Sequence, residues 1–218
     1  MLEHGGLVAV HEPFDNIADH GSTAVNGHHV TDPAELIATL RGLAGTATVF
    51  VKETTDRRHP AVLADRRFLA EVRHTFLIRA PAEIAASCYA LQGPRLTQSE
   101  LGLEHAYDLY QAILAAGGAQ PVVVDSDDLI ADLAATVAAY CTATGIPFRR
   151  PALHWAAGNR DEWRQSARWH VRVSESTGFT QPPTSYAVTT ANNAMLARYS
   201  AYHEPFYRAL HAHRIAIS

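Results

Sequence analysis

Residues 75–87 read TFLIRAPAEIAAS, and this stretch decides the fold that we expect. The short run Thr75–Ile78 suits a buried strand, and Pro81 begins a helix at its first position, where the missing N–H costs nothing. Arg79 stands at the end of the strand, and Ser87 lies about two turns into the helix. An arginine fork and a hydroxyl in these positions can both reach one phosphate group. The stretch therefore predicts a strand, a turn and a helix that hold an anion.

Three similar runs lie elsewhere, and longer segments with helical periodicity separate them. The runs are Leu7–Val10, Thr48–Val51 and Pro121–Val124. This alternation is typical of βαβ units, so we expect an α/β fold with a parallel sheet between two layers of helices. The predicted helices cover residues 32–43, 60–69, a stretch from residue 81, 99–116, 126–143 and 192–213, which makes the C-terminal part helical. No segment resembles a linker, and we expect one domain over residues 1–218.

The composition excludes several classes of protein. Hydrophobic residues make up 47% and charged residues 18% of the 218 residues, which gives enough apolar material for a core and too little charge for disorder. The net charge of −4 and the lack of a basic stripe argue against a protein that binds nucleic acid. No run approaches the length of a membrane span, and the N-terminus lacks the pattern of a signal peptide. We therefore expect a cytoplasmic protein that does not bind membranes.

Cysteine and histidine usage favours neither a disulfide nor a metal centre. Cys88 and Cys141 fall in alanine-rich, helical segments, which favours free thiols. The thirteen histidines include the close pairs His28-His29 and His211-Ala212-His213, whose spacing does not match that of a helical zinc pair. We therefore expect no metal.

Charged side chains follow the predicted strands at the edge where α/β sheets bind ligands. His11 and Glu12 follow the first strand, Lys52 and Glu53 the second, and Arg79 the third. Lys52 is the only lysine in the chain. Cations that face helix N-termini form an anion pocket, so this edge predicts a site for a phosphate or sulfate ester with a carboxylate base beside it.

The spacing of eight residues from Arg79 to Ser87 resembles a motif of the sulfotransferases that use 3′-phosphoadenosine 5′-phosphosulfate (PAPS). In that family a strand ends in Arg-x-Pro, and a serine eight residues after the arginine binds the 3′-phosphate. Val49–Glu53 is similar to the family's strand ending in lysine, and Asp125–Phe148 to its strand, helix and Gly-Ile-Pro turn. Trp169–Phe179 is similar to the late Ser-Thr-Gly loop of bacterial members, so the resemblance is to the bacterial type of the family. The resemblance covers about Leu7 to Phe179.

This resemblance implies a P-loop-NTPase-like, three-layer sulfotransferase fold and transfer of a sulfuryl group from PAPS to a hydroxyl or amine of a small molecule. It implies that PAPS and its product nucleotide PAP are held by Arg79, Ser87, Ser176, Thr177 and Gly178.

The same resemblance implies the catalytic residues. Glu12 is our first choice of base, Lys52 would stabilise charge on the departing oxygen, and His11, Glu53 and His59 are reserves. Better-known members have a histidine two residues after the lysine, where this chain has Thr54, which favours Glu12. Burial would have to raise the pKa of Glu12 for it to act well near pH 7.

The sequence departs from the family pattern at its start. Members begin with a strand and a Pro-Arg-Ser-x-Ser-Thr loop that binds the 5′-phosphosulfate, whereas this chain starts with Met-Leu-Glu-His-Gly, similar to the end of the helix that follows that loop. Residues upstream of Met1 could supply the loop, or a second copy, a partner subunit or another arrangement of the ligand could compensate for it.

Two other functions stay open at this point. A repurposed or non-catalytic relative could act as a subunit of a heteromeric biosynthetic complex on a sulfated intermediate. A P-loop kinase relative lacks support, because no Gly-Lys-Thr/Ser loop is present. The tryptophans at 155, 163 and 169 could line an acceptor pocket without identifying the acceptor.

Overall fold

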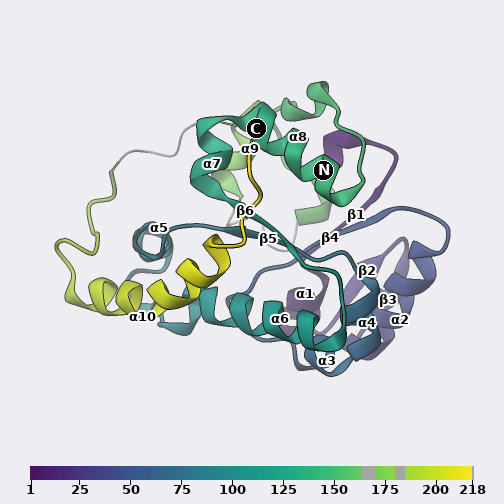
Figure 1. Ribbon diagram of the computed structural model, residues 1–218, viewed down its shortest axis with the longest axis horizontal. Helices are drawn as coiled ribbons and strands as arrows, with labels where there is room; N and C mark the ends of the chain where they lie inside the picture. Colours follow the sequence, from purple (N-terminus) through teal and green to yellow (C-terminus); the bar gives the residue numbers. More distant parts are fainter. Residues whose placement is uncertain (164–169, 180–184, 218) are drawn as a thin grey trace. The chain divides into compact units, whose positions relative to one another are not determined.

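The computed structural model describes residues 1–163, 170–179 and 185–217 (Figure 1). They fall into two compact units. The first contains Met1–Thr54, His59–Phe68 and the described part of Arg149–Thr180, and the second contains Thr55–Arg58, Leu69–Phe148 and the described part of Gln181–Ser218. The expectation of one domain over residues 1–218 stays a prediction.

The first unit is built on a parallel pair of strands, β1 (Val8–His11) and β4 (Val49–Lys52). Between them the chain forms α1 (Pro13–His20), an antiparallel hairpin of β2 (Thr23–Val25) and β3 (His28–Val30), and α2 (Pro33–Ala44). Later parts add α3 (Pro60–Ala64), a 3-10 turn at Arg150–Leu153 and the short helix α9 (Val171–Ser174). The core of this unit contains Val10, Phe14, Val25, Val30, Leu36, Ile37 and Leu40.

The helix α2 shows how the sequence determines these elements. The Asp32 carboxylate accepts hydrogen bonds from the N–H groups of Ala34 and Glu35, both at 2.9 Å, and Pro33 occupies the first helical position. Leu36, Ile37 and Leu40 then recur on one face and are buried. The cap and the apolar face together make residues 33–44 helical.

The second unit is built on another parallel pair, β5 (Thr75–Ile78) and β6 (Val122–Asp125). The C-terminal segment continues this pairing, because the Ile215 N–H donates to the Val123 carbonyl at 2.8 Å. The helices are α5 (Pro81–Gln92), α6 (Leu103–Ala116), α7 (Ser126–Ala131), α8 (Leu133–Thr144) and α10 (Ala194–His211). The helix α4 (Arg66–Glu71) connects the two units in sequence.

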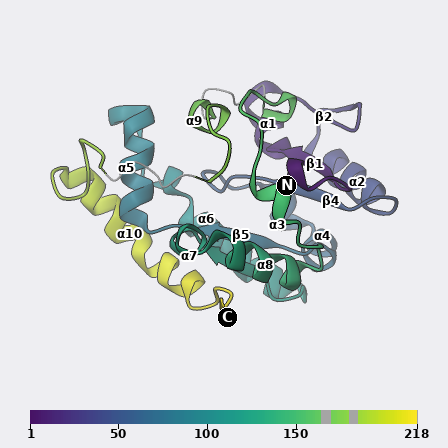
Figure 2. The same ribbon diagram turned by 90° about the horizontal axis from the view of Figure 1, so that it is seen from above.

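Helices cover both faces of the second strand pair. Helices α7 and α8 lie on one face, and α6 and α10 lie on the other (Figure 1). Helix α10 also packs along α5 (Figure 2), where Leu196 joins a cluster with Ala85, Leu96 and Leu101. The prediction of an α/β fold with parallel strands between helices is therefore confirmed, and each predicted strand lies within one residue of the observed one.

Three predicted helices are interrupted. The helix expected over residues 60–69 breaks at Asp65, whose carboxylate accepts from the Phe68 N–H at 2.9 Å. The helix expected over residues 126–143 breaks at Asp132, whose carboxylate accepts from the Ala135 N–H at 3.0 Å. In both places an aspartate caps a new helix instead of continuing the old one.

The third interruption is at Gly102, where a 3-10 turn changes to α6 with a φ of 74°. A Cβ at this position would lie 2.8 Å from the Thr55 carbonyl oxygen. The turn therefore needs glycine both for its backbone conformation and for the close approach of residue 55. Among the described residues, no helix combines the length and apolar character needed to cross a bilayer.

Candidate active site

The ends of β1 and β4 bring the predicted catalytic residues together. The two strands pair in parallel with His11 opposite Lys52, so their carboxyl ends meet at one edge. The Glu12 N–H donates to the Lys52 carbonyl at 2.6 Å and extends the ladder by one residue. His11, Glu12, Lys52 and Glu53 are therefore neighbours, as the sequence predicts.

Glu12 connects β1 to α1 through a sharp turn. It precedes Pro13, the first residue of α1, and its backbone is left-handed, with φ 47° and ψ 48°. This conformation costs a residue with a Cβ roughly 1 kcal/mol or more. The Glu12 side chain makes no capping hydrogen bond to α1. The turn instead directs the carboxylate toward Lys52.

The Glu12 carboxylate contacts both a cation and an imidazole. Lys52 Nζ donates a short hydrogen bond to Glu12 Oε1, and His11 Nε2 lies 3.4 Å from Glu12 Oε2. Burial tends to raise the pKa of Glu12, but the charge and hydrogen bond of Lys52 outweigh it and lower that pKa. The carboxylate is thus ionised at neutral pH, which differs from the raised pKa that the sequence argument required of a base.

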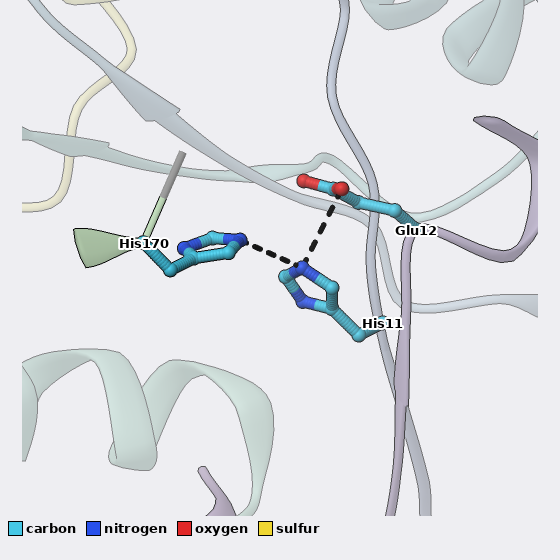
Figure 3. Close-up of side chains that lie close together, drawn as sticks. All are labelled: His11, Glu12 and His170. Carbon is cyan, nitrogen blue, oxygen red and sulfur yellow. Dashed lines mark hydrogen bonds and ion pairs between the residues drawn. The ribbon is translucent and has the colours of Figure 1, made fainter. Parts of the chain in front are cut away.

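A second imidazole, which the sequence analysis did not select, completes this group. His170 Nε2 lies 3.1 Å from His11 Nε2, and the two rings meet edge to face (Figure 3). The Trp163 indole stacks on His170 with ring centroids 4.9 Å apart. His170 lies inside the stretch Trp169–Phe179 that resembles the family's late loop, but its contact spans 159 residues and no local pattern marks it.

Both imidazoles are neutral near pH 7. Burial lowers the pKa of His11 to about 4, with Lys52 and His170 adding to this and Glu12 opposing it. Burial also lowers the pKa of His170. One Nε2 must then donate its proton to the other, which fixes opposite tautomers for the pair.

A second group of polar side chains surrounds Glu53. Its carboxyl accepts from the Phe14 N–H at 2.8 Å through Oε2 and from the Thr54 N–H at 3.2 Å through Oε1, and it shares a hydrogen bond with Asp15. The Thr54 hydroxyl donates to Asp15 Oδ2 at 2.5 Å, and His59 Nε2 lies 3.5 Å from Asp15 Oδ1. Burial and the neighbouring Asp15 raise the pKa of Glu53 to about 9. Glu53 is therefore protonated at pH 7.

Within the described part of the chain, two sets of side chains have donor atoms within 4.8 Å of one another, close enough to share a cation: His11, Glu12 and His170, and Asp15, Glu53 and His59. In the first set the Lys52 ammonium already neutralises Glu12, and in the second burial and the neighbouring Asp15 keep Glu53 protonated. We assign no metal to either set, and the expectation that no metal binds stays a prediction.

The residues predicted to bind the nucleotide belong to both units. In the second unit, Arg79 follows β5 and donates to Glu83 Oε2 at 2.6 Å, and the half-buried Ser87 lies on α5. In the first unit, Ser176 Oγ accepts from Trp155 Nε1 at 3.1 Å, and the Thr177 carbonyl accepts from the Trp155 N–H at 3.2 Å.

These hydrogen bonds attach the Ser-Thr-Gly loop to residues 154–155, where Gly178 also forms an isolated antiparallel β-bridge with His154. Trp169 lies outside the described residues, and no described contact shows an acceptor pocket lined by the tryptophans.

The site combines an ammonium, a carboxylate and an imidazole at the carboxyl ends of two parallel strands, the edge where α/β proteins bind their ligands. The sequence profile of the sulfotransferase domain family matches residues 11–214. This match covers most of the chain, and the chain belongs to that family.

Two curated relatives come from Arabidopsis thaliana. Branched-chain-amino-acid aminotransferase-like protein 1 is 35% identical over 113 residues, and protein 2 is 32% identical over 117 residues. These matches cover 50% and 52% of this chain, but only about a fifth (20%) of each relative. Among solved structures, the sulfotransferase domain from the curacin biosynthetic pathway aligns over 78% of this chain and 67% of its own, with a TM-score of 0.38 and 12% identity.

Proposed function

We propose that this chain transfers a sulfuryl group from PAPS to a hydroxyl or amine of a small molecule. Membership of the sulfotransferase domain family supports the class of reaction. The contact of Lys52 with Glu12 carries the proposal for this chain, because it joins an ammonium and a carboxylate at one strand edge. Sulfuryl transfer needs both a cation for the departing oxygen and an acceptor for a proton.

The reaction balances with these groups. The acceptor oxygen or nitrogen forms a bond to sulfur while the bond from sulfur to the phosphate oxygen breaks, and the electron pair of that bond leaves with PAP. The acceptor proton passes to the Glu12 carboxylate. Lys52 stabilises the negative charge that develops on the departing oxygen.

The donor would also activate the base. In the structure, Lys52 holds the pKa of Glu12 down. When Lys52 turns to the phosphosulfate, Glu12 loses that contact, and its burial then raises its pKa toward the value useful in a base. His11, which lies 3.4 Å from Glu12 Oε2 and is neutral, is positioned to take the proton onward.

The residues present fit the nucleotide in part. Arg79, two residues before α5, and Ser87, within that helix, offer a guanidinium and a hydroxyl for the 3′-phosphate. Arg79 must exchange its contact with Glu83 for the phosphate. The chain as given contains no Pro-Arg-Ser-x-Ser-Thr sequence for the 5′-phosphosulfate.

Calorimetric titration with PAP tests the nucleotide part of the proposal. We expect binding to the wild type and a loss of at least tenfold in affinity in Arg79→Ala, which removes a charge-assisted contact worth about 1.5–3 kcal/mol. Arg208→Ala is the matched control, because Arg208 forms an equivalent i,i+4 pair with Glu204 on α10 and its own side chain is exposed. No PAP binding by the wild type would overturn the proposal.

Release of PAP from PAPS tests the chemistry, with simple phenols, alcohols and amines as acceptors. Glu12→Gln should lower turnover about 100-fold or more while PAP affinity stays unchanged. Equal losses of turnover and affinity would mean that Glu12 has only a structural role.

A second candidate function is a non-catalytic relative that acts as a subunit of a complex with a partner chain or a second copy. The contact of Arg79 with Glu83 favours it, because the guanidinium is already occupied. This alternative predicts no PAP binding and no effect of Arg79→Ala.

A further inference from the structure

Two carboxyl groups meet beside the site, where the end of β4 passes the start of α1. Glu53 directly follows Lys52, and Asp15 lies three residues after Glu12. Neighbouring residues of an extended chain project to different sides. Lys52 accordingly contacts Glu12, whereas Glu53 contacts the first turn of α1.

Glu53 supplies the cap that Glu12 does not. Glu12 occupies the N-cap position of α1, but its side chain makes no capping hydrogen bond. The first N–H groups of a helix need partners outside the helix. Glu53 Oε2 meets this need from the neighbouring segment by accepting from the Phe14 N–H at 2.8 Å.

Asp15, in the first turn of α1, contacts the same segment after β4. It shares a hydrogen bond with Glu53 and accepts the Thr54 hydroxyl at 2.5 Å. Residues 53 and 54, which follow the end of the β1–β4 pairing, are thus held against the first turn of α1 by side-chain contacts. The Glu53 and Asp15 carboxyls have oxygen atoms within 4.8 Å of each other, so ionising both in a buried place is unfavourable, and Glu53 keeps its proton.

We propose that Glu53 is the positioning residue of the site: it caps α1 in place of Glu12 and, joined to Asp15, fixes the end of β4, so that the Glu12 carboxylate is left to contact Lys52. This role replaces the reserve catalytic role expected from the sequence, because Glu53 is engaged with backbone and Asp15. The inference rests on the proposed function for its effect on turnover, whereas the contacts themselves do not depend on it.

The single lysine makes the test selective. Protein grown with 13C-labelled lysine gives the NMR signals of one side chain, Lys52. Glu53→Gln keeps a neutral group that can accept from the Phe14 N–H and donate to Asp15, so the Lys52 signals at pH 7 should match those of the wild type. Glu53→Ala should shift them toward the values of an exposed, mobile lysine. Glu35→Gln, the same substitution at an exposed position of α2, is the control and should change nothing.

A pH titration of the same signals separates positioning from mere packing. The titratable groups around Glu53 are Asp15 on α1, His59 before α3 and Lys52 itself. The wild type should show a step in the Lys52 shift with a midpoint near 9 as Glu53 ionises, and Glu53→Gln should lack that step.

Unchanged Lys52 signals in a folded Glu53→Ala variant, or a step near pH 9 that survives in Glu53→Gln, would overturn the proposal. If Glu53→Ala does not fold, the pH titration of Glu53→Gln still tests the proposal. A failure of PAP binding in the wild type would overturn the proposed function and leave these NMR outcomes unaffected.

Discussion

The Lys52 ammonium bonds to the Glu12 carboxylate across a parallel strand pair, although 40 residues separate the two in sequence. The pairing of His11 with Lys52 places both groups at the same edge. The chain has one lysine, and the fold places it opposite the carboxylate that a transfer reaction would use as base. The pKa of Glu12 consequently depends on what Lys52 contacts.

Replacing the lysine should release Glu12 from this control. In Lys52→Met the charge and hydrogen bond that lower the pKa of Glu12 are gone, so burial dominates and the pKa rises. Carboxyl 13C NMR measures this, with Glu12→Gln identifying the signal. Lys52→Arg keeps a cation and should hold the pKa below its usual range. A Glu12 titration that is the same in wild type and Lys52→Met would contradict the ion pair.

The left-handed backbone of Glu12 predicts an unusual order of stabilities. Glycine adopts φ 47° without a Cβ penalty, so Glu12→Gly should be about 1 kcal/mol more stable to unfolding than Glu12→Ala. Urea denaturation of the two variants measures the difference. At Glu35, inside α2, the order should reverse, because glycine there costs about 1 kcal/mol relative to alanine. A Glu12→Ala variant as stable as Glu12→Gly would show that the turn is not strained.

The sequence predicted the strands and the site edge because both depend on local patterns. Continuous apolar runs mark strands covered on both faces, and polar residues after them mark the edge. The β2–β3 hairpin was missed although Asn26-Gly27, with positive φ at both residues, is a strong turn signal between its short strands. Each of these strands has three residues, which is too short for an alternation of apolar and polar residues to indicate a strand.

The rest of the site depends on contacts that a linear pattern does not contain. His170 reaches His11 from 159 residues away, and only the folded chain shows the pair. The sequence placed Glu53 at the strand end, but it could not show that the side chain turns to the Phe14 N–H. Burial raises the pKa of Glu12 and Lys52 lowers it, and which of the two is stronger depends on the assembled site.

The raised pKa of Glu53 predicts how stability depends on pH. Between the usual carboxyl pKa near 4.5 and the folded value of about 9, the folded state holds a proton that the unfolded state has lost. Stability from this group is therefore fully present below pH 4.5 and is lost as pH rises to about 9, with a slope of at most about 1.4 kcal/mol per pH unit. Glu53→Gln removes this dependence.

Denaturant unfolding of wild type and Glu53→Gln across pH 5–9 measures the difference, which should grow in favour of the variant as pH rises. Glu35→Gln, on an exposed part of α2, should run parallel to the wild type. Parallel curves for wild type and Glu53→Gln would mean that Glu53 is ionised in the folded protein at neutral pH.

The lowered pKa of His11 gives stability the opposite dependence on pH. Because the pKa of His11 is lowered to about 4, the unfolded state binds a proton between pH 4 and 6.5 that the folded state does not, and stability rises with pH through this window. His170→Ala removes one of the influences that lower the pKa and opens the site to water, so His11 should titrate at a higher pH and the gain in stability should shrink. Proton NMR of the His11 imidazole, identified by its loss in His11→Phe, follows the titration, and His28→Ala, at an exposed position of β3, serves as control. A His11 midpoint that stays near 4 in His170→Ala would show that the two rings do not interact.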